Sequence, residues 1–278
     1  MSRNYYYLVA GLPELLLGQS KRPFELAAFK NELRDFLHPE DYRLVELFFL
    51  PYDHINLLNL LEKKTAPFLT LGRYSQEELE EAIREPVEVP EYFRVFIERF
   101  REEAGVWQDR PWENQIAELY YDHAGSFSNE FIRDWFEFEK NLRNILTAYN
   151  CRKYSLPADQ ELIGQGDLVE SLKKSQVRDF GLSGEVDHMD RLLGILDQKD
   201  LLEREKGLDL LRWTHLDELT TFHYFSTEVI LSYVVKLLII ERWLTLDRAT
   251  GEQLFGRFLE DLKNSYEFPT EYTINERR

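Results

Sequence analysis

The sequence has little cysteine, little positive charge and no long apolar run, and each shortage excludes a class of protein. Cys151 is the single cysteine among 278 residues, so the chain cannot form an internal disulfide. Acidic residues outnumber basic ones 51 to 34, and the net charge of −17 disfavours binding to nucleic-acid phosphates. The longest apolar tract, residues 229–240, contains Ser232 and Lys236 and is too short to cross a bilayer. We therefore expect a soluble protein, without a signal peptide, whose relation to a membrane goes through other subunits.

Short motifs of catalysis are missing as well. Gly-x-Ser-x-Gly, which would place a nucleophilic serine on a strained turn, does not occur. Gly164-Gln165-Gly166 is too short for a phosphate-binding loop and instead predicts a turn before a helix. Cys151 has only scattered histidines available as bases. We therefore expect no catalytic residue.

Glutamate and histidine occur once in an order and spacing that suit a metal ion. Glu185-x-x-His188 would place two ligands on one helix face, but a carboxylate-bridged di-iron bundle needs two such motifs and two further glutamates. His215-x-x-Glu218 has the reversed order. We therefore expect no metal and no other cofactor, and we predict that the protein purifies without stoichiometric iron, manganese or zinc.

Apolar and aromatic residues at helical spacing dominate the chain. They make up 44% and 14% of the sequence, enough for a substantial core, and no segment shows sustained period-two alternation. The fold class predicted is all-α. We expect one or two long helices over residues 108–150 with a break at Gly125 and Ser126, a buried helix over residues 216–243, and a last helix from Thr250.

A six-residue phrase occurs twice, which indicates an internal repeat. Asn56-Leu57-Leu58-Asn59-Leu60-Leu61 returns 85 positions later as Asn141-Leu142-Arg143-Asn144-Ile145-Leu146. Capping-box signals at Ser75, Asp167 and Thr250, separated by 92 and 83 residues, predict three helix starts. We interpret the chain as three helical repeats within one compact unit, with boundaries at residues 1–88, 89–180 and 181–278.

The repeated asparagines are the candidate site. Two asparagines three residues apart lie on the same face of a helix, and a buried amide must be hydrogen-bonded. They could bond neighbouring backbone, line a polar cavity or form a joint between repeats, and we favour the joint. The acidic residues that precede each pair are included in the candidate set, which comprises Asp53, Asn56, Asn59, Glu139, Asn141 and Asn144.

A longer pattern surrounds these phrases: an acidic residue, Asn-Leu in an apolar helix, basic residues, a glycine and a capped helix. It spans residues 52–75, residues 137–168 and, in a more degenerate form, residues 229–262. This pattern resembles the repeat of the C subunit of V/A-type rotary ATPases, called subunit d in eukaryotes. Tyr5-Tyr6-Tyr7-Leu8 resembles that family's tyrosine-rich opening. The whole chain is also similar to an uncharacterised bacterial family associated with V-type ATPases of Bacteroides-like bacteria.

The resemblance implies a funnel of three helical bundles about a pseudo-threefold axis. It implies a non-catalytic central-stalk subunit that couples the shaft of the soluble head to the membrane rotor ring during proton or sodium transport. The expected location is cytoplasmic, peripheral to the inner membrane through these partners. The acidic charge favours an acidic or amide-lined opening that meets a basic shaft tip. Two alternatives stay open, a helical metal-dependent enzyme and a generic helical repeat scaffold unrelated to an ATPase.

Overall fold

The computed structural model describes residues 3–19, 21–102 and 110–265, with residues 247–265 described as backbone only. This part of the chain is all-α: it contains helices and no strand beyond an isolated bridge between Asn4 and Ser226. The first half holds α1 (Tyr6–Gly11), α2 (Leu26–Phe36), α3 (Pro39–Leu47), α4 (Leu50–Leu61), α5 (Gln76–Arg84) and α6 (Glu91–Arg101). The second half holds α7 (Trp112–Gly125), α8 (Glu130–Tyr154), the 3-10 turn η1 (Ala158–Gln160), α9 (Asp167–Lys174), α10 (Met189–Leu196), α11 (Leu201–Thr220) and α12 (Thr227–Ser265).

Of the three predicted capping boxes, one forms completely. The Ser75 side chain accepts from the Glu78 N–H and the Glu78 side chain accepts from the Ser75 N–H, which starts α5. At Asp167 the helix does begin, but Gly166 occupies the N-cap position and no side chain caps it. The prediction of a helix start at Thr250 is wrong, because Thr250 lies inside α12. The backbone before Thr250 is already helical, so this residue does not take the extended conformation that an N-cap requires.

One predicted helix boundary is confirmed by the structure and another is not. The expected break at Gly125 and Ser126 is confirmed, because α7 ends at Gly125 and Asn129 caps α8 through the Ile132 N–H. The single helix expected over residues 216–243 is divided between α11 and α12 by a turn at residues 221–226. Gly164 and Gly166 both have positive φ, which fits the predicted turn before α9.

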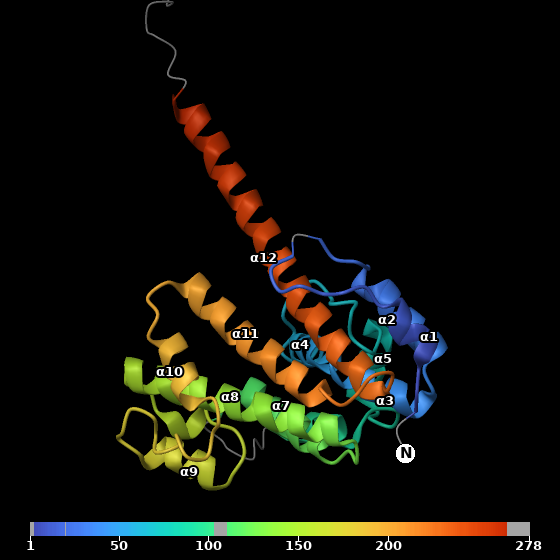
Figure 1. The fold of residues 1–278 in the computed structure, drawn as a ribbon, viewed down its shortest axis with the longest axis horizontal. Coiled ribbons are helices and arrows are strands. Elements are labelled where there is room, and N and C mark those ends of the chain that lie inside the picture. Colours follow the sequence, from blue (N-terminus) through green and yellow to red (C-terminus); the bar gives the residue numbers. More distant parts are fainter. Residues whose placement is uncertain (1–2, 20, 103–109, 266–278) are drawn as a thin grey trace, which may run out of the picture.

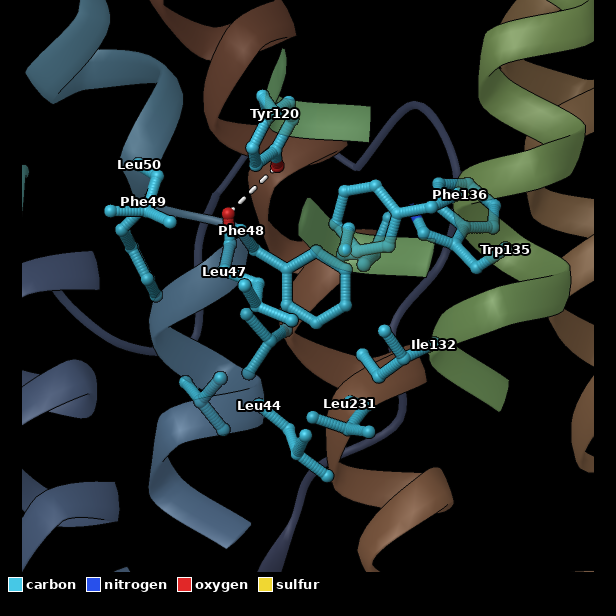
Figure 2. Packing of buried hydrophobic residues seen from close by; sticks show 14 of the residues in the cluster. Leu44, Leu47, Phe48, Phe49, Leu50, Tyr120, Ile132, Trp135, Phe136 and Leu231 are labelled. Carbon is cyan, nitrogen blue, oxygen red and sulfur yellow. Dashed lines mark hydrogen bonds between the residues drawn. The ribbon is translucent and has the colours of Figure 1, made fainter. Parts of the chain in front are cut away.

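The apolar side chains form two clusters. The first joins α2 to α7 with the first half of α8 and with α12, and so draws helices from all three expected repeats. Figure 2 shows its centre, where the Phe48 ring at the turn between α3 and α4 stacks on Phe136 of α8 with ring centroids 5.6 Å apart. The Tyr120 hydroxyl of α7 donates to the Leu47 carbonyl over 2.8 Å, which satisfies the end of α3.

The second cluster joins the remainder of α8 with α9, α10 and the first part of α11. Helix α8 is long enough to contribute Ile132 and Phe136 to the first cluster and Ile145 and Ala148 to the second. Figure 1 shows α9 and α10 at one side of the molecule and α1 to α5 at the other, with α7 and α8 beneath α11. Helix α8 therefore connects the two cores, as does α11, which places Leu216 in the first core and Leu208 and Leu211 in the second.

Helix α12 has two parts with different surroundings. Ile230, Leu231, Val234 and Leu237 are fully buried in the first core. The later part of the helix leaves the body of the molecule and projects from it as a rod (Figure 1). Among the described residues, no helix combines the length and the apolar character needed to span a bilayer.

Candidate functional site

Asp53 of α4 fixes the loop that leads to α5. Its carboxylate is fully buried and accepts two backbone hydrogen bonds, from the N–H of Arg73 over 2.7 Å and from that of Tyr74 over 3.2 Å. Gly72 lies directly against it, since a Cβ at Gly72 would stand 2.1 Å from Asp53 Oδ1. The loop backbone can therefore reach the carboxylate only because residue 72 has no side chain.

Lys30 of α2 holds the same loop from the other side. Its ammonium donates to the Leu71 carbonyl over 2.8 Å and to the Gly72 carbonyl. Burial raises the pKa of Asp53 to about 6, although the two backbone N–H groups and the nearby Lys30 charge act in the opposite direction. Burial likewise lowers the pKa of Lys30, opposed by Asp53. The pair therefore gives the backbone of this loop both an acceptor, Asp53, and a donor, Lys30.

Asn56, one turn after Asp53, makes a paired contact with the same loop. Its Nδ2 donates to the Leu69 carbonyl and its Oδ1 accepts from the Leu69 N–H, both over 2.9 Å. Asn144 of α8 repeats this with Ile163, donating over 2.8 Å to its carbonyl and accepting over 3.0 Å from its N–H. We call this arrangement, an asparagine paired with both backbone groups of one loop residue, the amide clamp.

The two amide clamps align the repeats differently from the repeated six-residue phrase. The repeated phrase aligns Asn56 with Asn141, whereas the structure gives equal contacts to Asn56 and Asn144, 88 positions apart. Asn59 and Asn141 are half-buried and take no part in the two clamps. Each phrase contains two asparagines one helical turn apart, so aligning the two phrases by sequence could not show which asparagine faces the loop.

The loop after α8, which carries Ile163, is held by further hydrogen bonds that the sequence did not predict. Buried Asn114 of α7 donates to the Gln160 carbonyl over 3.2 Å and to Glu161 Oε2 over 3.0 Å. Arg143, inside the second phrase, donates to Asn114 Oδ1 over 2.7 Å. These contacts bring α7, α8 and the loop after α8 together, and only the tertiary arrangement reveals them.

Glu139 has a different surrounding from the asparagines. Its Oε1 accepts from Arg212 Nε of α11 over 2.7 Å, and Arg212 Nη1 reaches Asp209 Oδ1 over 3.1 Å. Asp209 is buried and also accepts from Trp243 Nε1 of α12 over 2.7 Å and from Arg242. This ion network therefore joins α8, α11 and α12, and Glu139 belongs to it rather than to the amide clamps.

The ion network lies in a cleft of about 410 Å³, which we call the central cleft. All three expected repeats contribute to its wall, which is lined by Phe48, Pro51, Tyr120, Tyr121, Trp135, Phe136, Glu139, Asp209, Arg212, Val235, Leu238, Ile239 and Arg242. Its two carboxylates are matched by two guanidinium groups. None of the repeated asparagines lines it, so the expected amide-lined opening is not found here.

Glu185 and His188 do not share a helix face, because residues 181–188 form turns and α10 begins only at Met189. Glu185 is exposed, whereas His188 points toward α11 and lies with its Nε2 3.7 Å from Glu218 Oε2. The same oxygen is 3.8 Å from Nδ1 of His215, one turn earlier in α11. The fold thus gathers His188, His215 and Glu218, and it leaves Glu185 apart from them because no helix forms between Glu185 and His188.

The His215 ring is held firmly. It stacks on Phe138 with centroids 4.0 Å apart and lies 6.2 Å from the ring of Trp135. Burial lowers the pKa of His215, with the Glu218 carboxylate opposing this effect. Its Nε2 is buried and has no hydrogen-bond partner among the described residues. The ring is therefore oriented by packing, with Nδ1 directed toward Glu218.

Comparison with known proteins gives two matches along the chain. A family model described as "Protein of unknown function (DUF2764)" matches residues 1–266. An uncharacterized protein of Chlamydia muridarum (strain MoPn / Nigg) is 22% identical over 274 residues, which cover 94% of this chain and 99% of that protein. No solved structure matches. The likeness to the chlamydial protein therefore extends over nearly the whole of both chains.

Proposed function

We propose that this chain, which belongs to the DUF2764 family, is a non-catalytic coupling subunit in the central stalk of a V-type rotary ATPase. In this proposal three helical repeats form a socket that receives the central-shaft subunits and rests on the membrane rotor ring. The protein would act at the cytoplasmic face of the inner membrane through these partners, without entering the bilayer or binding nucleic acid.

The observation that carries the proposal is the central cleft. Helices from all three expected repeats meet there, and the ion network of Glu139, Arg212 and Asp209 holds the second and third together. A subunit that transmits torque must resist deformation between its points of attachment. Closely packed aromatic side chains and buried ion pairs supply that resistance, because dense interiors transmit strain.

The two amide clamps give further support. Each holds the loop after a long helix on that helix, so the α4–α5 and α8–α9 units share one internal construction. A third unit of this kind is not formed around Thr250, where α12 is continuous. The socket proposed here is therefore built from two similar units and a third, divergent one made of α11 and α12.

The test is isolation of the tagged chain from native membranes, followed by identification of the proteins that accompany it. We expect rotor subunits of a V-type ATPase to co-purify. Leu238→Trp, which fills the central cleft, should release the shaft subunits. Val177→Trp, a matched change at an exposed residue outside the cleft, should retain them. A chain that recovers no ATPase subunit would point instead to a generic repeat scaffold.

Salt dependence tests how the partner is recognised. With a net charge of −17, attraction to a basic shaft tip would be screened as the Debye length falls from roughly 14 to roughly 4 Å between about 50 and 500 mM salt. We therefore expect binding to the shaft subunits to weaken over this range. Binding that is unchanged or tighter would indicate an apolar interface.

A further inference from the structure

We propose that His188, His215 and Glu218 form a binding site for a divalent transition-metal ion, with zinc as the ion that fits best. The inference goes beyond the coupling function and does not depend on it, and it departs from the sequence-based expectation of no metal. His188 stands immediately before α10, whereas His215 and Glu218 occupy one face of α11, one turn apart. An ion bound here would connect two helices that pack together in the second core.

The three side chains are already near coordination geometry. The shared Glu218 Oε2 lies 3.7 Å from His188 Nε2 and 3.8 Å from His215 Nδ1, and all three donor atoms lie within 4.8 Å of one another. In a tetrahedral zinc site with bonds of about 2.1 Å, donor atoms stand roughly 3.4 Å apart. The two edges that meet at Glu218 must therefore shorten by a few tenths of an ångström. The His188–His215 edge, which is at most 4.8 Å, must shorten by up to about 1.4 Å, and rotation of the partly exposed His188 side chain supplies this.

The chemistry of the ligands selects the class of ion. Two imidazole nitrogens and one carboxylate oxygen suit zinc and its transition-metal neighbours, whereas magnesium and calcium favour all-oxygen sites. Three protein ligands leave the fourth tetrahedral position open to water. The ion would therefore be bound in an open site and not enclosed by protein ligands on all sides.

Access and orientation also fit a binding site. The Glu218 side chain is 54% exposed and that of His188 is 27% exposed, so an ion can enter from solvent. His215 is only 18% exposed, and its stacking on Phe138 fixes the ring that carries the innermost ligand. One rigid ligand and two adjustable ones allow the site to close around an ion without moving the helices. The negative field of the chain further raises the local concentration of cations.

The test uses the full-length chain without a polyhistidine tag, treated with a chelator and titrated with zinc by calorimetry. We expect one saturable equivalent. At a free zinc concentration 100-fold above Kd, the melting temperature should rise by roughly 5 °C. Cobalt should give the visible absorption of a tetrahedral site with nitrogen and oxygen ligands. These three measurements report binding directly and need no enzymatic activity.

Two matched variants separate the site assembled by the fold from the pair suggested by sequence spacing. Glu218→Gln should abolish the saturable equivalent and the thermal shift, whereas Glu185→Gln, which changes an exposed glutamate three residues before His188, should leave both unchanged. His188→Gln should behave like Glu218→Gln, and its partly exposed position keeps the core intact. Zinc binding that survives Glu218→Gln, or that is never saturable at one equivalent, would overturn the proposal in favour of diffuse binding to the acidic surface.

Discussion

At the scale of single residues, the position of the α4–α5 loop depends on a carboxylate and a missing side chain. Asp53 was recognisable from the sequence as an acidic residue in an apolar helix, but its role was not. The backbone of residues 72–74 folds over it, and Gly72 alone permits the approach. The dependence of one residue on the other, 19 positions apart, follows from the tertiary packing.

Replacing Gly72 with alanine should be strongly destabilising. The new Cβ would lie 2.1 Å from Asp53 Oδ1, so the loop must move and both backbone hydrogen bonds to the buried carboxylate must weaken. We expect the free energy of unfolding, measured in urea, to fall by roughly 2 to 4 kcal/mol. Gly194→Ala is the matched control, because a Cβ there meets open space within α10 and should stabilise the protein by up to about 1 kcal/mol. Similar losses in the two variants would contradict this account.

Asp53 should also give stability a particular pH dependence. Burial raises its folded-state pKa from 3.8 to about 6, so the folded state binds the proton more tightly than the unfolded state. The contribution of Asp53 is therefore fully present below about pH 4 and is lost as the pH rises to about 6. A difference of two pKa units corresponds to roughly 3 kcal/mol.

Asp53→Asn should remove this part of the profile. Glu46, whose pKa burial also raises, remains in the variant and contributes to both curves. We expect the difference in unfolding free energy between the two proteins to change between about pH 4 and 7, with the unmodified protein losing the larger part. Parallel curves over this range would show that the Asp53 pKa is not raised.

At the scale of helices and loops, the sequence predicted a helix start or break well where the groups that form it lie within a few residues of each other. It predicted less well whether a helix continues. The capping box at Ser75 and the break at Gly125 involve groups within a few residues of each other, and both were confirmed. The box at Thr250 failed because a capping signal acts only where the preceding backbone leaves the helix. The turn at residues 221–226 was missed because apolar helical spacing continues on both of its sides.

The amide clamps predict that the two asparagines of each repeated phrase contribute unequally to the free energy of unfolding. Asn56→Ala leaves the Leu69 N–H and carbonyl without their partner, and Asn144→Ala does the same to Ile163. Each should lower the free energy of unfolding by roughly 2 to 4 kcal/mol. Asn59→Ala and Asn141→Ala, at half-buried positions outside the clamps, should change it by about 0.5 kcal/mol or less. If Asn141→Ala costs as much as Asn144→Ala, the register derived from the clamps is wrong.

At the scale of the whole molecule, the sequence suggested three repeats, whereas the apolar side chains form two clusters joined by α8. Periodicity shows which face of a helix is buried but not which helices share a core. The meeting of His188 with Glu218, 30 positions apart, is a consequence of the same packing. Fold class was therefore accessible from sequence, and the distribution of helices between cores was not.

The ion network that joins α8, α11 and α12 should contribute to the stability of the fold. Arg212→Leu leaves Glu139 without its partner and weakens the compensation of buried Asp209, so we expect a loss of about 3 to 5 kcal/mol in unfolding free energy. Arg178→Leu removes a similar arginine from an exposed pair with Asp197 and should cost about 1 kcal/mol or less. Unfolding in urea followed by circular dichroism makes the comparison. Equal losses of unfolding free energy in the two variants would show that the ion network stabilises the fold no more than an exposed ion pair does.

The projecting half of α12 affects how the molecule diffuses. At 1.5 Å per residue, a helix of 39 residues is about 58 Å long. A compact chain of 278 residues, by contrast, has a radius of gyration of about 19 Å. A rod attached to a body of that size increases frictional drag far more than it increases mass. A single copy should therefore elute early from a gel-filtration column and imitate a larger species. Scattering that reports mass directly is consequently the appropriate measure of how many copies associate.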